Sequence, residues 1–97
     1  MTIEKTVNGN DVTLKIEGWM DTQSAPMLEQ ALGEIGPEVK HLTLGLGGLE
    51  SVSSAGIRRI VAAHKQMNGA LTLRHVSIVV QDVLAMTGID RKLHIEP

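Results

Sequence analysis

Two adjacent serines, Ser53 and Ser54, are the residues whose type and position first suggest chemistry. They follow the run "LGLGG" and directly precede the apolar helical pattern "AGIRRIVAA", so their hydroxyl groups are expected at the start of a helix. A hydroxyl group there can cap the helix, act as a nucleophile beside free backbone N–H donors, or accept a phosphate. The surrounding sequence has to decide among these three roles.

The nucleophile role lacks its usual context. A serine hydrolase needs a base and an oxyanion hole, and the sequence "SVSSAG" does not contain the G-x-S-x-G turn that exposes such a serine. No His and Asp residues are assigned as its partners by their spacing. We therefore expect that the protein is not an enzyme and that it has no catalytic residues.

Cofactor and metal sites are also not expected. The "GLGG" run, Gly45 to Gly48, lacks the third glycine of the dinucleotide-binding pattern G-x-G-x-x-G, because Glu50 stands there, and the apolar helical pattern begins only at Ile57. These glycines are better explained by a turn with positive φ or by close packing. The four histidines show no i, i+4 pair of the kind that binds a metal on a helix.

The composition argues against nucleic acids and membranes as binding partners. The 97 residues suffice for one domain, and the chain has no cysteine for disulfides or thiolate chemistry. A net charge of −2 and one aromatic residue, Trp19, give neither the basic surface nor the stacking platform that nucleic-acid binding requires. No apolar segment approaches the roughly 18 residues of a membrane span, and no export signal is recognised. We expect a cytoplasmic protein without membrane insertion.

The elements that position the serines follow from hydrophobic periodicity. Residues 3–7 and 11–18 are expected to form a hairpin around "NGN", and later strands are expected at residues 39–46, 70–76 and 92–95. Helices are expected from near Ser24 to Gly36, with Asp21 or Thr22 as N-cap, from Ser53 to Asn68, and from Ser77 to Gly88. The order ββαβαβαβ predicts an α/β fold with a small mixed sheet, antiparallel in its opening hairpin and then parallel, covered by about three helices.

Three segments in this order resemble the STAS domains of bacterial anti-sigma factor antagonists. "LGLGGLESVSSAGIRRIV" is similar to the family's "LDLSGLEYISSAGLRVLL", whose other branch carries "DSSG" at the serines. "LKIEGWMDTQSAPMLEQAL" is similar to the opening "LxGxLDxxxAxxLxxxL", and "VVQDVLAMTGIDRKLHI" to the closing "VxxVLxxTGLDxxFxI". The resemblance extends over the chain and implies a single STAS domain at residues 1–97.

The resemblance implies a partner-switching protein that takes part in transcription regulation. Such an antagonist binds a serine-kinase anti-sigma factor while unphosphorylated, is released when that kinase phosphorylates it, and is restored by a PP2C-type phosphatase. The family's phosphorylated serine falls on Ser54, with Ser53 as the second choice. Asp21 matches the Asp before the first helix and Gly56 matches the motif glycine; these two, with Ser53 and Arg58, are the expected partner-binding residues. No small-molecule substrate is expected.

The sequence also departs from the family pattern around the serines. Gly45 replaces a frequent Asp, Gly47 replaces a Ser, Ser51 replaces an aromatic residue, and Ser53 replaces the Asp of the "DSSG" branch. These changes favour an alternative, a STAS subunit without a phosphorylation switch, such as the small component of a lipid-transport ABC complex or of a scaffold assembly. Arg58 lies four residues after Ser54 and can pair with a phosphoserine, whereas Arg59 is expected to be solvated.

Overall fold

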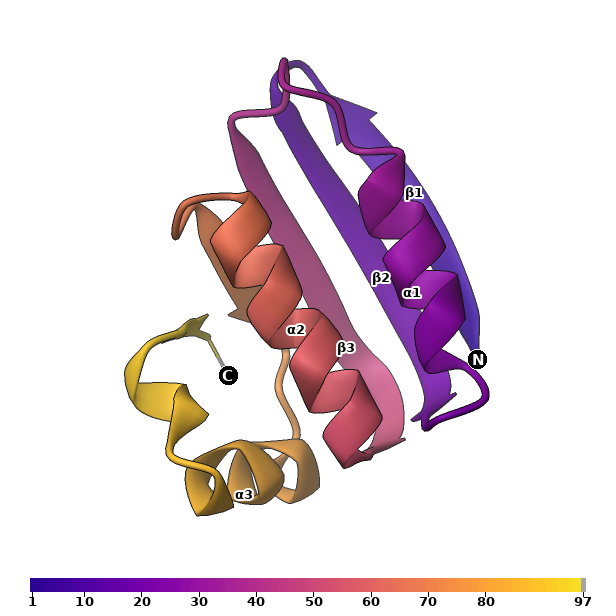
Figure 1. Ribbon diagram of the computed structural model, residues 1–97, viewed down its shortest axis with the longest axis vertical. Coiled ribbons are helices and arrows are strands. Elements are labelled where there is room, and N and C mark those ends of the chain that lie inside the picture. The colour runs from indigo at the N-terminus through magenta and orange to yellow at the C-terminus, as the bar shows by residue number, and fades with distance from the viewer. Residues whose placement is uncertain (97) are drawn as a thin grey trace.

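The computed structural model describes residues 1–96 and confirms the expected mixed α/β fold (Figure 1). Five strands form one sheet in the order β1-β2-β3-β4-β5, in which only the β1–β2 pair is antiparallel. The elements are β1 (Thr2–Asn8), β2 (Asp11–Met20), α1 (Ala25–Gly33), β3 (His41–Val52), α2 (Ser54–Gln66), β4 (Leu71–Arg74), α3 (Ile78–Met86), the 3-10 helix η1 (Ile89–Arg91) and β5 (His94–Ile95).

The β1–β2 hairpin forms as its sequence predicts. Gly9 has a φ of 63°, a conformation that suits glycine in the tight turn between Asn8 and Asp11. Along β2, side chains alternate between the core and the solvent, because successive residues of a strand point to opposite faces. The period of two in "DVTLKIEG" therefore determined which face of the sheet is buried.

Helices α1 and α2 lie side by side over one face of the sheet, and α3 lies at the end of the sheet near the start of α2 (Figure 1). The core between these layers is aliphatic, as the composition predicts. Its large, fully buried side chains come from three strands and all three helices and include Leu14, Ile16, Met20, Leu28, Leu42, Leu44, Leu46, Ile60, Leu71, Leu73 and Leu84. The opposite face of the sheet has no helix over it and carries polar side chains and glycines.

The glycine run is where the expected strand boundary was wrong. Of the two explanations for these glycines, the turn does not form, since β3 continues to Val52 and none of the three has a positive φ. Close packing is found at Gly47 and Gly48. Lys15 pairs with Gly45 and Glu17 with Gly48, so β3 uses one more residue than β2 over this stretch. The resulting bulge accommodates the extra glycine inside the strand and leaves the sheet continuous up to the serines.

Two methionines lie on the surface, although methionine commonly fills gaps in an apolar core. Met27 is 44% exposed and Met86 is 86% exposed, together with Ile78 and Val79 on the same outer side of α3. Methionine is found both in cores and on surfaces, so its presence in a short apolar helix such as "IVVQDVLAM" does not indicate which face is buried. The packing of α3 against the sheet, which buries Val80 and Leu84, decides which residues remain exposed.

Candidate functional site

The two serines have different positions at the start of α2. Ser53 is the N-cap residue: it has extended backbone angles, its Oγ accepts a hydrogen bond from the Gly56 N–H at 3.4 Å, and its carbonyl accepts from Ile57 at 2.9 Å. Ser54 is the first residue of the helix and is exposed. The cap prediction is therefore confirmed for Ser53, and the free hydroxyl group on the surface is that of Ser54.

Asp21 builds the turn that lies beside the serines. Its Oδ1 accepts hydrogen bonds from the N–H groups of Ser24 at 2.9 Å and Gln23 at 3.0 Å and from the Ser24 hydroxyl at 3.0 Å. These bonds, the backbone N–H of Ser24 first, lower the pKa of the Asp21 carboxyl below its ordinary 3.8. Asp21 thus organises the turn before α1, whereas Ser24 occupies the N-cap position that was expected for Asp21 or Thr22.

A backbone hydrogen bond joins this turn to the serines. The Ser53 N–H donates to the carbonyl of Met20 at 2.8 Å, so Asp21 follows directly after the residue that binds Ser53. The carbonyl oxygen of Trp19 lies 2.8 Å from Ser24 Oγ and shares the single hydrogen of this hydroxyl group with Asp21 Oδ1. The ends of β2 and β3, the Asp21 turn and the start of α2 therefore form one connected structure around Ser54.

Gly56 lets the first turn of α2 lie close to the sheet. A Cβ atom at this position would lie 2.7 Å from Val52 Cγ2 and 2.8 Å from both Cγ and Sδ of Met20, distances too short for real contacts. Gly56 is buried, and Met20 is 1% exposed. The glycine expected from the family motif is therefore explained by the packing of α2 against Met20 and Val52.

The two arginines after the serines differ in their surroundings. Arg58 is exposed on the first turns of α2, as expected for a residue available to a phosphate or an acidic partner. Arg59 is partly exposed and forms a surface ion pair with α1, because its Nη1 lies 3.1 Å from Glu29 Oε2. An ion pair between residues thirty positions apart leaves no local signal in the sequence.

Sequence reasoning missed the exposed apolar residues at this end of the molecule. Trp19 is 62% exposed near the end of β2, and α3 exposes Ile78 at 81% and Val79 at 59%. The alternation that places Lys15 and Glu17 on the open face of β2 continues to Trp19, so that signal was present in the sequence. Large exposed apolar side chains are typical of protein contact surfaces.

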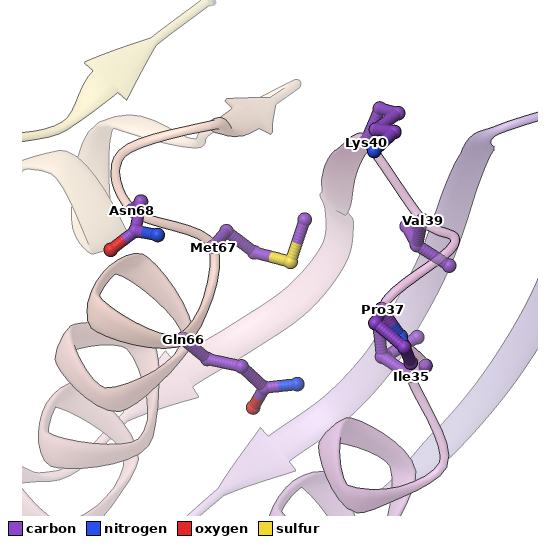
Figure 2. A pocket seen from close by; sticks show the side chains of 8 residues that line it. Ile35, Pro37, Val39, Lys40, Gln66, Met67 and Asn68 are labelled. Carbon is purple, nitrogen blue, oxygen red and sulfur yellow. The ribbon is translucent and has the colours of Figure 1, made fainter.

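The opposite end of α2 contains a cavity of about 400 Å³ (Figure 2). Ile35, Pro37 and Val39 line one side of it, and Gln66, Met67 and Asn68 line the other. Gln66 Nε2 also donates a hydrogen bond to the Leu32 carbonyl at 2.8 Å, which connects the ends of α1 and α2. This cavity is separated from the serines by the length of α2.

Neither a metal site nor a membrane span is found in the described part of the chain. Residues 1–96 contain no group of three His, Asp or Glu side chains arranged to hold a metal ion. Over the same residues, no helix combines the length and the apolar character required to cross a membrane.

The sequence profile of the family described as "Mlab, STAS domain" matches residues 3–96. The match covers nearly the whole chain, so the chain belongs to the STAS domain family. The search of curated proteins found no match.

Solved structures of the same fold include several anti-sigma factor antagonists. A putative one from Thermotoga maritima has a TM-score of 0.88 at 19% identity, covering 98% of this chain and 86% of that chain. One from Mycobacterium paratuberculosis has a TM-score of 0.89 at 20% identity, covering 99% and 85%. The antagonist SpoIIAA in its unphosphorylated form gives 0.75 at 16% identity, covering 97% and 87%. Phosphorylated SpoIIAA of Bacillus gives 0.66 at 14% identity, covering 97% and 90%. At these identities the likeness establishes the fold.

Proposed function

We propose that the protein is an anti-sigma factor antagonist and that phosphorylation of Ser54 switches its binding to a serine-kinase anti-sigma factor. The observation that carries this proposal is the division of roles between the serines, since Ser53 caps α2 and Ser54 presents an exposed hydroxyl group beside it. The likeness to SpoIIAA, known in unphosphorylated and phosphorylated forms, supports it. A PP2C-type phosphatase would restore the unphosphorylated state, and the protein itself acts as a binding module.

The position of Ser54 suits such a switch because it tolerates a phosphate in the free protein. The first backbone N–H groups of a helix lack partners within the helix and form the positive end of its dipole. A phosphate on Ser54 at this position is stabilised by both effects, and Arg58, exposed one turn later, supplies a cation for it. Phosphorylation therefore leaves the fold intact.

The same phosphate opposes binding to a partner that covers Ser54. A partner that covers unphosphorylated Ser54 contacts a neutral hydroxyl group. After phosphorylation, the same contact would have to bury nearly two negative charges. If this costs about 3 to 4 kcal/mol, the affinity falls by roughly 100- to 1000-fold. The exposed apolar side chains of Trp19, Ile78 and Val79 near this end supply contact area for the unphosphorylated complex.

A pull-down from the native host, combined with the intact mass of the recovered protein, tests this proposal. We expect a serine-kinase anti-sigma factor to co-purify with the unphosphorylated protein, and a second form, heavier by one phosphate, to be recovered without that kinase. Recovery of the phosphorylated form in the kinase complex would contradict the proposal.

The second candidate is a STAS subunit of a lipid-transport ABC complex that has no phosphorylation switch. It is favoured by the family description "Mlab, STAS domain" and by Gly45 and Gly47, which replace the Asp and Ser that antagonists often carry before the serines. Co-purification with a transporter ATPase, together with an unmodified Ser54 peptide in mass spectrometry, would favour this candidate over the first.

A further inference from the structure

The face of the sheet that the helices leave uncovered contains a groove of about 520 Å³ over β3. Its lining comes from outward-facing residues of β2, β3 and β4, which alternate with buried aliphatic residues on the other face, and from His75 directly after β4. The volume lies within the range of small-molecule sites, roughly 300 to 1000 Å³. The groove is therefore large enough for a ligand and does not involve Ser54.

Two of the three glycines in the groove are explained by side chains that lie over them. A Cβ atom on Gly48 would lie 2.6 Å from Cγ of Glu17, and one on Gly47 would lie 3.3 Å from Cβ of His75. Glu17 on β2 and His75, which follows β4 directly, thus lie across these glycines. Together they close one end of the groove.

Gly45 has no such explanation. A Cβ atom there would meet only the backbone of β2, at 3.8 Å from Lys15 Cα and 3.9 Å from the Leu14 oxygen, which are ordinary contacts. Its φ is not positive, so its backbone conformation does not require glycine either. Glycine inside a strand lowers stability, and it often marks a place where a ligand approaches the backbone closely. Gly45 therefore places no side chain over the backbone of β3 in the groove.

Two residues with cationic side chains flank Gly45 on the neighbouring strands. Lys15 on β2 and Arg74 on β4 are the residues paired with Gly45 on its two sides. Strands lie about 4.8 Å apart, so the two Cα atoms are separated by about 10 Å across Gly45. Arg74 Nε lies 3.2 Å from Glu96 Oε1, so a bound anion would share the Arg74 guanidinium group with the Glu96 carboxylate. Thr13 and Thr43, themselves a cross-strand pair, supply hydroxyl groups at the open end.

We propose that this groove binds a small organic anion. A phosphate or carboxylate head group lies between Lys15 and Arg74, where charge-assisted hydrogen bonds are available, and the body of the ligand lies on Gly45 toward the hydroxyl groups of Thr13 and Thr43. The Glu17 carboxylate at the closed end repels a second negative charge there. The ligand therefore carries its charge in one head group and has a polar, uncharged body.

Titration of the complete 15N-labelled chain with three compounds of similar body tests this proposal. Glycerol 3-phosphate and glycerate carry the two head groups, and glycerol is the uncharged control. We expect saturable amide shifts centred on Lys15, Gly45 and Arg74 with at least one of the two anions, and none with glycerol. The tighter of the two anions identifies the head group. Shifts that do not saturate, or that spread equally over all exposed cationic residues, would overturn the proposal.

Variants separate the groove from general charge effects. Lys15→Gln should lower the affinity about tenfold or more, because it removes one charge-assisted contact, whereas Lys5→Gln on β1, outside the groove, should not change it. Gly45→Val should abolish binding while the thermal midpoint stays the same or rises. Ser54→Ala should bind as the wild type does. Wild-type affinity in both Lys15→Gln and Gly45→Val would overturn the proposal.

Discussion

The two ends of α2 are built differently. At its start, Ser53 caps the helix, Gly56 packs directly on Met20, and the Asp21 turn is held by three hydrogen bonds. At its end, the chain leaves the helix through Asn68 and Gly69, both with positive φ, beside a cavity of about 400 Å³ (Figure 2).

This difference indicates where a protein partner is expected to bind. A partner gains affinity from a surface whose side chains are already fixed, because less conformational entropy is lost on binding. The start of α2 offers such a surface around one free hydroxyl group. The other end of α2 has a cavity, which a partner would have to fill with its own side chains to make comparable contact.

The largest effect is expected from a charge placed on Ser54. Ser54→Asp should weaken binding to the kinase partner about 100-fold, because a carboxylate would be buried in a contact formed around a neutral hydroxyl group. Asn68→Asp adds the same charge at the cavity end and should leave the affinity unchanged. Isothermal titration calorimetry measures both. Equal effects of the two variants would show that the ends do not differ in binding.

Packing at the two ends should respond in opposite directions to an added methyl group. Gly56→Ala should lower the free energy of unfolding by about 1 to 3 kcal/mol, because its Cβ would overlap Met20 and Val52. Gly33→Ala, at the end of α1 near the cavity, meets nothing within 4 Å and should raise it by about 0.5 to 1 kcal/mol. Urea denaturation measures both changes. A neutral Gly56→Ala variant would contradict the tight packing described at the serine end.

The division of roles between the serines predicts a smaller difference in stability. Ser53→Ala should cost about 1 kcal/mol, because it removes the cap of α2, whereas Ser54→Ala should stay within about 0.5 kcal/mol of the wild type. Thermal unfolding followed by circular dichroism measures the two changes. If Ser54→Ala proved the more destabilising variant, the assignment of the cap to Ser53 would be wrong.

The smallest effect concerns the Asp21 turn and depends on pH. Because hydrogen bonding lowers the pKa of Asp21 in the folded protein, its contribution to stability is complete above 3.8 and is lost as the pH falls below that value. Wild type should therefore be more stable than Asp21→Asn near neutral pH, and the difference should shrink in acid. Denaturation midpoints of both proteins over this range measure it. A difference that stays constant would mean that the Asp21 charge does not matter.

Local rules predicted much of this architecture. The cap at Ser53 and the hairpin around Gly9 each depend on a few neighbouring residues, and both are present. The continuation of β3 through its glycines was not predictable in this way, because pairing with β2 and β4 overrides the weak strand preference of glycine. The Arg59–Glu29 pair and the exposed side of α3 likewise depend on tertiary packing.

The structure shows where the expected site residues lie and how they are held, and the way they are held was not predictable from the sequence. Asp21, Ser53, Gly56 and Arg58 lie at the same end of the molecule. Asp21 holds a turn, Ser53 caps α2, and Gly56 allows the helix to pack closely on the sheet. The alternation along β2 already indicated that Trp19 lies on the open face, whereas the exposure of Ile78 is decided by the packing of α3.

The most direct test of the Ser54 assignment is phosphorylation by the purified partner kinase with ATP, followed by intact mass. Wild type and Ser53→Ala should each gain one phosphate, since the cap is not the acceptor, and Ser54→Ala should gain none. A phosphate on Ser54→Ala, or its loss in Ser53→Ala alone, would contradict the account.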